Sequence, residues 1–253
     1  MRQTALVALM AFTAVGAARA QTSLDAQKRQ EAAKAYRRGE ALMREESYEE
    51  AAAHFRTAVK LDPLMSIAHY SLGQSQMALK HYPEAVEAYQ GCRETFERIA
   101  SLGTQEKNAI EKAREDEIRE LKDSLLRVQQ GKIKGNTLAL EVGIQERLRV
   151  LEGSRMKGNE ERLGVPAEVM LALGSAYFRS GQLVEAEPAY KEAVQTDPKL
   201  GPAYNNLAVI YMLSQRYPEA KDALQRAEKS GFIVNPALKN DLESRARAAG
   251  AKR

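Results

Sequence analysis

The chain has 253 residues with one Cys and three His, so an intramolecular disulfide framework and a multi-thiolate metal site are excluded. Hydrophobic residues make up 44% and charged residues 28%, which is typical of a folded protein rather than a disordered chain. Trp is absent and 40 residues are Ala, which favours helices. The net charge of +4 falls to +2 without residues 1–20, too small a value to mark a nucleic-acid-binding surface.

Residues 1–20 have the layout of a secretory signal peptide. Arg2 precedes an apolar run over residues 4–17, and residues 18–20 form an A-x-A cleavage site. The run is about 14 residues long, shorter than the roughly 20 that span a bilayer, which argues against an uncleaved anchor. We therefore expect a bacterial Sec-type leader, a mature chain beginning at Gln21 and exported to the periplasm or beyond, and no transmembrane segment after cleavage.

Residues 21–99 contain an N-terminal helix and two copies of a 34-residue unit, 32–65 and 66–99. The matched positions are Gly39 and Gly73, Tyr48 and Tyr82, Ala51 and Ala85, Phe55 and Tyr89, and Ala58 and Cys92. A helical Gly costs about 1 kcal/mol relative to Ala, which is acceptable where another helix approaches closely. Cys92 takes a place held by Ala in the first copy, so we interpret it as a small buried side chain; pairing with another chain is the alternative.

Residues 100–166 contain no aromatic side chain, and 25 of these 67 residues are charged. Apolar residues recur at spacings of three and four, which is typical of a coiled-coil seam. The seam residues are Ile118, Leu121, Leu125 and Val128, followed by Leu140, Ile144, Leu148 and Leu151. We predict one long helix over residues 104–130 and a second helix that completes a charged hairpin; two degenerate copies of the 34-residue unit are the alternative.

Residues 167–234 contain two more copies of the unit, 167–200 and 201–234. The matched positions are Leu173 and Leu207, Gly174 and Ala208, Tyr177 and Tyr211, Ala186 and Ala220, Tyr190 and Leu224, and Ala193 and Ala227. Asp62-Pro63 and Asp197-Pro198 close the first and third copies, where Pro ends one helix before the next begins. Pro188 lies deeper in its helix, and we expect a late start or a kink there.

Residues 235–253 form the last segment, in which Asn235-Pro236 begins a helix with Leu238 and Leu242 as its apolar stripe. Repeat arrays need a terminal element with a polar outer face to cover the last repeat. We therefore predict a capping helix followed by a short basic tail.

The four copies resemble the tetratricopeptide repeat, a 34-residue helix–turn–helix unit. The second copy departs from the pattern by lacking the closing Pro, and the fourth has Ala208 in place of Gly and Phe232 where Pro is expected. The resemblance implies an all-α solenoid of helix–turn–helix repeats. In this chain a charged helical hairpin would lie between two repeat pairs, with a capping helix at the C-terminus.

No catalytic pattern is visible in the sequence. Gly153 and Gly158 have the spacing of a phosphate-binding loop, but the Lys and Ser/Thr that must follow are missing. Gly174-Ser175 lacks the second Gly of a nucleophile elbow. The acidic run of residues 115–117 is balanced by neighbouring Arg residues, as on a solvated helix face. We predict no enzyme activity, no metal and no cofactor.

The resemblance also implies a binding surface, because in arrays of this family the first helix of each repeat lines a concave groove. Residues three before, one after and four after the Gly39 position would face it. The positions carried over are Tyr36, Glu40, Met43, Tyr70, Gln74, Met77, Leu171, Ser175, Phe178, Asn205, Val209 and Met212. The three Met residues and Phe178 would form a soft apolar stripe suited to peptides; their packing against the next repeat or the hairpin is the alternative.

A second family feature concerns recognition of a C-terminal carboxylate, for which some members use Lys, Asn and Arg at set places. Here Tyr36 and Glu40 occupy the first two such places, and Asn206 alone has the expected type. We therefore predict no carboxylate clamp.

These observations together predict a non-catalytic scaffold that binds a partner protein or peptide along the groove and does not bind nucleic acid. The alternative is a structural role, in which the central hairpin joins two chains as a homodimer or spaces two short arrays.

Overall fold

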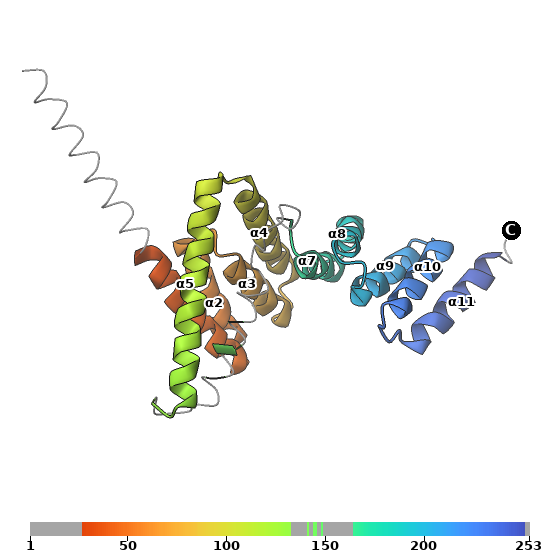
Figure 1. Cartoon of the computed structure of the whole chain (residues 1–253). Helices are drawn as coiled ribbons and strands as arrows, with labels where there is room; N and C mark the ends of the chain where they lie inside the picture. The colour runs from red at the N-terminus through yellow and green to blue at the C-terminus, as the bar shows by residue number, and fades with distance from the viewer. Residues whose placement is uncertain (1–26, 133–140, 142–143, 146–147, 149–163, 251–253) are drawn as a thin grey trace, which may run out of the picture. The chain divides into compact units, whose positions relative to one another are not determined.

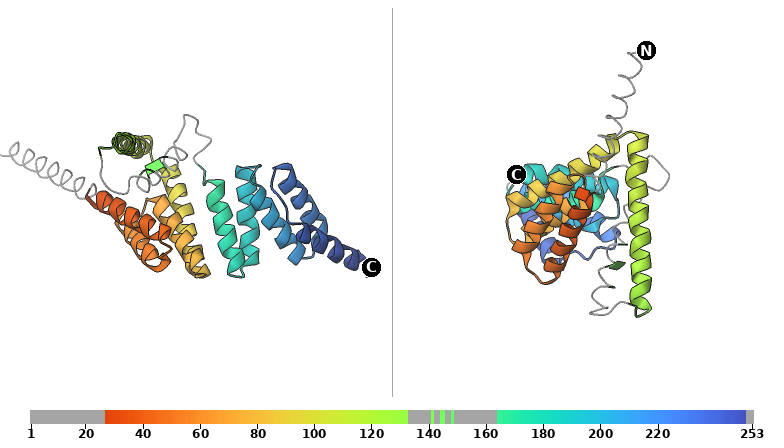
Figure 2. Two further views of the ribbon diagram at one scale, coloured as in Figure 1. Left: turned by 90° about the horizontal axis from the view of Figure 1, so that it is seen from below. Right: turned by 90° about the vertical axis from the view of Figure 1, so that its left-hand side faces the viewer.

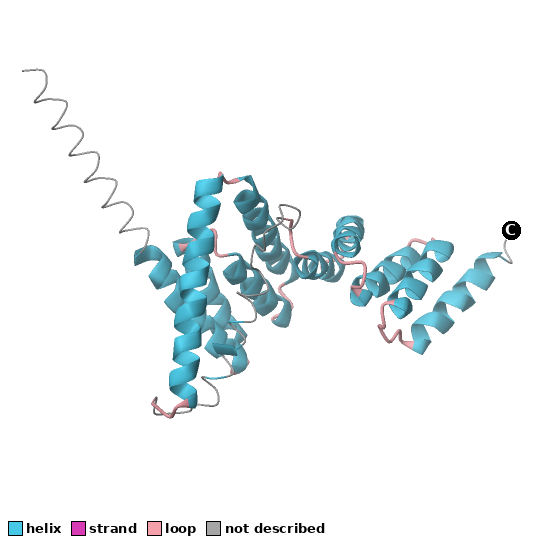
Figure 3. Ribbon diagram, viewed as in Figure 1, coloured by secondary structure: helices cyan, strands magenta, loops and turns pink. Residues whose placement is uncertain are grey.

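The computed structural model describes residues 27–132, 141, 144–145, 148 and 164–250. Within these residues every regular element is an α-helix (Figure 3). The chain divides into two units. Unit 1 contains the described residues up to Thr95 together with those from Val165 onward, and unit 2 spans Phe96–Gly164. The predicted signal peptide at residues 1–20 lies outside the described residues.

Unit 1 is built from pairs of short helices, labelled in Figure 1. Residues 27–44 form its first helix. The following helices are α2 (Tyr48–Leu61), α3 (Ser66–Ala78), α4 (Tyr82–Ser101, which continues into unit 2), α7 (Ala167–Arg179), α8 (Leu183–Thr196), α9 (Gly201–Leu213), α10 (Tyr217–Lys229) and α11 (Pro236–Gly250). The starts of α3, α7 and α9 coincide with the starts of three predicted repeat windows. Figure 2 shows α7, α8, α9 and α10 side by side in chain order.

The packing inside a repeat explains the spacing of its glycines. A Cβ atom at Gly39 would lie 2.6 Å from the Phe55 ring, and one at Gly73 would lie 2.6 Å from the Tyr89 ring. At Gly174 the ring of Tyr190 would be 2.7 Å away. Each ring belongs to the second helix of the repeat and lies directly on the glycine of the first. The prediction of close helix approach at these glycines is confirmed.

The turn between the two helices of a repeat closes in the same way four times. One residue at the same place in each turn has a positive φ: Glu46 (58°), Lys80 (62°), Gly181 (82°) and Gln215 (58°). The N–H of the following residue donates to the carbonyl five residues earlier: Ser47 to Leu42, His81 to Gln76, Gln182 to Tyr177, and Arg216 to Tyr211. These are 6→1 bonds of the Schellman type, which satisfy carbonyls at the helix end.

The two Asp-Pro sequences also act as predicted. Asp62 follows the end of α2 and its Oδ1 accepts a hydrogen bond from the N–H of Leu64 at 3.1 Å. Asp197 follows α8 and accepts from the N–H of Lys199 at 2.9 Å. Of the two alternatives expected at Pro188, the late helix start is wrong, because α8 begins at Leu183 and continues through the proline; the kink stays a prediction.

Repeats two and three contact each other directly, although residues 100–166 separate them in the sequence. Three side-chain pairs join α4 to α7 and α8: Gln90 with Tyr177, Tyr82 with Arg179, and Arg93 with Glu192. The amide of Gln90 donates to the Tyr177 hydroxyl at 2.7 Å. Because the two repeat pairs are in contact within one unit, residues 100–166 do not hold them apart as a spacer.

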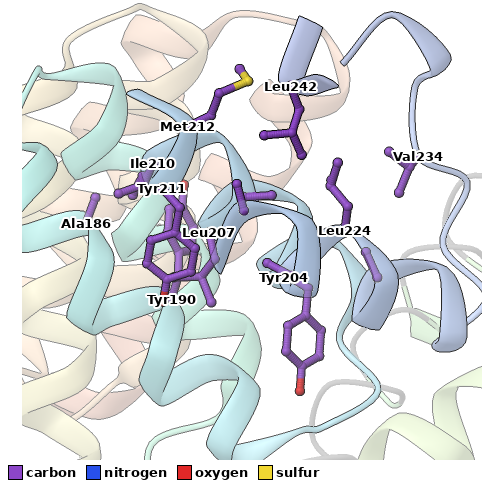
Figure 4. Packing of buried hydrophobic residues seen from close by; sticks show 14 residues of the cluster. Ala186, Tyr190, Tyr204, Leu207, Ile210, Tyr211, Met212, Leu224, Val234 and Leu242 are labelled. Carbon is purple, nitrogen blue, oxygen red and sulfur yellow. The ribbon is translucent and has the colours of Figure 1, made fainter. Parts of the chain in front are cut away.

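The C-terminal half of unit 1 has a large apolar cluster (Figure 4). Figure 4 shows its side chains gathered from α8, α9, α10 and α11. Tyr190 and Ile210 are almost completely buried within it, and Leu242 of α11 is buried against the same cluster. On its outer face α11 carries the ion pairs Asp241–Arg245 and Glu243–Arg247. This helix therefore covers the apolar end of the last repeat, as predicted.

Unit 2 contains α5 (Thr104–Gln129), a helix of 26 residues and about twice the length of a repeat helix. Val128 is buried in a cluster with Ile144 and Leu148, against which Ile118, Leu121 and Leu125 pack. The predicted apolar seam is therefore used for contact between residues 118–128 and 144–148. Most of the second predicted helix lies outside the described residues, so the hairpin stays a prediction.

Candidate functional site

The candidate binding surface consists of the twelve side chains predicted to line the groove, together with Asn206, and is called the first-helix face below. They lie on residues 27–44, α3, α7 and α9, the first helices of the four repeats. Their exposure differs widely. Gln74 is exposed, Tyr36 and Met212 are buried, and the others are half-buried.

In the first repeat, the predicted residues contact one another and the next repeat. The Tyr36 hydroxyl donates to Glu40 Oε1 at 2.9 Å and lies 3.5 Å from the hydroxyl of Ser71. The Ser75 hydroxyl donates to the sulfur of Met43 at 3.1 Å. Tyr36 is only 3% exposed, so it packs beneath the first-helix face and presents little surface to a partner.

In the second repeat, α3 provides the most accessible part of the face. Gln74 is exposed, and Tyr70 and Met77 on the same helix are half-buried. The Tyr70 ring packs against Tyr89, with centroids 5.5 Å apart and planes tilted by 59°. Burial raises the pKa of Tyr70, so its hydroxyl stays protonated and available as a hydrogen-bond donor at neutral pH.

In the third and fourth repeats, two residues of the predicted apolar stripe pack against the apolar cluster. Phe178 packs against the apolar cluster of unit 1, and Met212 is a member of that cluster with 6% exposure. Asn205 and Asn206 are half-buried, and the amide of Asn205 donates to Asn206 Oδ1 at 3.4 Å. The amides of Asn205 and Asn206 therefore present polar groups on α9, whereas Met212 presents almost no accessible surface.

The contacts between repeats two and three were missed by sequence reasoning. Arg179 Nη2 donates to the Tyr82 hydroxyl at 3.0 Å, and its guanidinium carbon lies 5.3 Å from the centre of the Tyr82 ring. Arg179 directly follows Phe178 of the first-helix face, so this contact joins the end of α7 to the second helix of repeat two. The signal in the sequence was present, because Tyr82 occupies the same repeat position as Tyr48 and Tyr217.

Metal ligands, membrane-spanning helices and the thiol of Cys92 are the other features of the described residues that bear on function. No cluster of three His, Cys, Asp or Glu side chains there is able to hold a metal ion. No helix in the described part of the chain has the length and apolar character needed to cross a membrane. Cys92 is buried, as predicted, and burial raises the pKa of its thiol to about 12, which leaves it unreactive.

Comparison with known families identifies the repeat. The model of the tetratricopeptide repeat matches residues 36–94, and a second model of the same repeat matches residues 167–231. The chain belongs to the tetratricopeptide-repeat family. Members of this family generally act as non-catalytic interaction modules, and the fold of this tetratricopeptide-repeat protein is that of a protein–protein interaction scaffold.

Solved structures with similar folds are only distantly related to this tetratricopeptide-repeat protein. PilW, a widely conserved type IV pilus biogenesis factor, has 17% identity and a TM-score of 0.40, with 87% of this chain and 86% of PilW covered. YrrB, a tetratricopeptide-repeat protein with an unusual peptide-binding site, has 18% identity and a TM-score of 0.27, with 78% and 84% covered. MamA from Desulfovibrio magneticus RS-1 has 16% identity and a TM-score of 0.28, with 79% and 95% covered. No curated protein matches the chain in sequence.

Proposed function

We propose that the protein is an exported, non-catalytic scaffold that binds a partner protein, or an extended segment of one, along the first-helix face. The observation that carries this proposal is the accessible stretch of α3, where exposed Gln74 lies between half-buried Tyr70 and Met77. Amide and phenol groups supply hydrogen bonds for a peptide backbone, and the Met side chain adapts to varied apolar residues. Solenoids of repeats use such extended surfaces for binding.

Photo-cross-linking tests this surface without a known partner. Gln74 is replaced by the photoreactive p-benzoylphenylalanine, and Gln225, which is also exposed but lies on the second helix of repeat four, receives the same replacement as a control. We expect a discrete adduct in the exported fraction from position 74 and none from position 225. An adduct from position 225 alone would contradict this and indicate that the second helices of the repeats carry the binding surface.

Polar substitution gives a second, independent test. Met77→Glu changes a half-buried residue of the face and should weaken capture of the cross-linked partner while the helix content stays the same. Met212 is unsuitable for this purpose, because a charge placed in the apolar cluster costs folding stability.

Export is part of the proposal and rests on the pattern of residues 1–20. Expression of the full-length gene in a bacterial host, followed by fractionation and N-terminal mass determination, tests it. We expect a periplasmic or secreted chain beginning at Gln21. A chain that keeps Met1 and stays in the cytoplasm contradicts export and leaves the binding surface unaffected.

Homodimer formation through the central segment is the second candidate, favoured by half-exposed Leu126 beside the seam of α5. Sedimentation equilibrium of the mature chain and of Leu126→Glu separates the two roles. A dimer that Leu126→Glu dissociates supports the second candidate, and a monomer at high concentration removes it.

A further inference from the structure

A pocket of about 230 Å³ lies between α8 and α9 and shares no residue with the first-helix face. Its apolar walls come from Leu183, Val184, Pro188 and Ile210. Val184, at the edge of the pocket, is 83% exposed. Exposed apolar groups around a hollow are typical of interaction sites.

The preceding repeat junction differs from this one at two repeat positions. Leu183 occupies the repeat position that holds Tyr48, Tyr82 and Tyr217 in the other three repeats. Between repeats two and three, Tyr82 extends to Arg179, which covers its ring and donates to its hydroxyl.

Between repeats three and four, both members of this aromatic–arginine pair are leucines. Leu183 replaces the tyrosine, and the position of Arg179 is taken by Leu213, which is 47% exposed. Between repeats three and four the chain thus has neither a tyrosine nor an arginine at the two positions that contact each other between repeats two and three.

The pocket also presents hydrogen-bond acceptors. Pro188 has no N–H, so the carbonyl of Val184 receives no helical hydrogen bond from residue 188. The hydroxyl of Ser214 lines the opposite side and both donates and accepts. A group with an O–H donor therefore finds acceptors beside the apolar walls.

The charged side chains at the rim are held in place by one another. Glu187 accepts hydrogen bonds from Lys191 at 2.7 Å and from Arg216 at 2.9 Å. Burial opposes ionisation of Glu187, but these two cations hold its pKa below the usual range. The carboxylate is thus neutralised within the chain, and the rim does not favour a charged occupant.

We propose that this pocket binds a tyrosine side chain presented by a partner protein. Its ring enters between Leu183, Pro188 and Ile210, beside the repeat position that carries Tyr82 at the preceding junction. Its hydroxyl donates to the Val184 carbonyl or the Ser214 hydroxyl. This second contact site is independent of the first-helix face, and it recognises one aromatic residue rather than an extended segment.

The test uses p-cresol, the side-chain analogue of tyrosine, titrated into the full chain with isotope-labelled methyl groups and followed by NMR. We expect saturable shifts at the methyl groups of Leu183, Val184 and Ile210. Toluene, which lacks the hydroxyl, should bind more weakly, because the pocket acceptors then stay unpaired.

Two variants close the pocket by different routes. Leu183→Tyr fills it with the residue found at the three equivalent positions, and Leu213→Arg restores the covering arginine. Each should weaken p-cresol binding by at least about tenfold while circular dichroism shows an intact fold. Val209→Ala, a change on the first-helix face, is the control and should leave p-cresol binding unchanged.

Several results would overturn the proposal. These are unaltered p-cresol shifts in both pocket-closing variants, shifts confined to the first-helix face, or the absence of saturation. Sedimentation identifies the remaining occupant: if the wild-type chain self-associates and Leu183→Tyr is monomeric, a second copy of this chain fills the pocket and no tyrosine partner is needed.

Discussion

The two units of this protein are both helical, yet their helices are held together by different packing. In unit 1 an aromatic ring of one helix lies on a glycine of the other, at Gly39 with Phe55 and again at Gly174 with Tyr190. In unit 2 the described contacts are between aliphatic side chains, with Val128 as the buried member on α5. The comparison shows that a fixed pairing of a large and a small residue sets the register of the repeats, whereas the seam of α5 depends on the heptad spacing.

Removing an aromatic ring from unit 1 should have the largest effect on the free energy of unfolding. Phe55→Ala deletes a fully buried side chain that packs on Gly39 and whose ring centroid lies 5.5 Å from that of Tyr36. We expect a loss of roughly 3–5 kcal/mol in the free energy of unfolding, measured by urea titration with circular dichroism.

The matched change in unit 2 is Leu125→Ala, which truncates a half-buried seam residue. Because the Leu125 side chain is already partly exposed to solvent, we expect a loss of about 1–2 kcal/mol in the free energy of unfolding. Equal losses for Phe55→Ala and Leu125→Ala would contradict the idea that ring-on-glycine packing dominates unit 1.

A smaller change tests the pairing itself. Gly174→Ala places a Cβ atom 2.7 Å from the Tyr190 ring. We expect a net loss of up to about 2 kcal/mol, because overpacking costs about 1–3 kcal/mol and the helix-propensity gain offsets about 1 kcal/mol of it.

The fourth repeat supplies the control, since Ala208 and Leu224 occupy the positions of Gly174 and Tyr190. Adding Tyr190→Leu to Gly174→Ala should therefore recover part of the lost stability, with a coupling of at least about 1 kcal/mol in a double-mutant cycle. Additive losses would mean that the two positions are not a matched pair.

The fold was largely predictable because the pairing of a glycine with an aromatic residue recurs periodically in the sequence. Gly39, Gly73 and Gly174 recur with a large side chain 16 residues later, and three predicted windows begin where α3, α7 and α9 begin. The positive-φ turns were not predictable. Glycine marks only Gly181, while Gln215 and its counterparts adopt the same backbone because the helix-closing hydrogen bonds stabilise it.

The candidate site was less predictable than the fold. The family rule names the face of each first helix, but it does not say which side chains the neighbouring elements cover. Tyr36 and Met212 are buried by such packing, whereas Gln74 stays exposed. The pocket at Leu183 was missed although the sequence carried a signal for it, because Leu183 stands at the repeat position that holds Tyr in the other three repeats.

Within unit 1, the junction between repeats two and three offers a weaker contact. Arg179→Ala removes both the cation–π contact and the hydrogen bond to Tyr82. Because Arg179 is exposed, we expect a loss of only about 0.5–1 kcal/mol in the free energy of unfolding. Tyr82→Leu, which copies the Leu183 junction, should cancel most of the Arg179 effect in a double-mutant cycle, and an undiminished effect of Arg179→Ala in that background would show that the pair does not act together.

The smallest expected effect is a dependence of stability on pH that distinguishes the two units. His54, His69 and His81 all lie in unit 1. His69 Nε2 lies 3.2 Å from the carbonyl oxygen of Pro63, and burial lowers the His69 pKa despite the opposing influence of that carbonyl, Glu94 and Asp62.

The unfolded chain therefore takes up a proton first as the pH falls below about 6.5. The free energy of unfolding should decrease from there until the pH passes the folded-state pKa. Urea midpoints at about pH 7.5 and about pH 5.5 measure this decrease, which His69→Gln should reduce. Hydrogen exchange at the same two pH values, corrected for the intrinsic rate, should show the change in unit 1 and none in α5; an equal change in α5 would point to a titrating group other than His69.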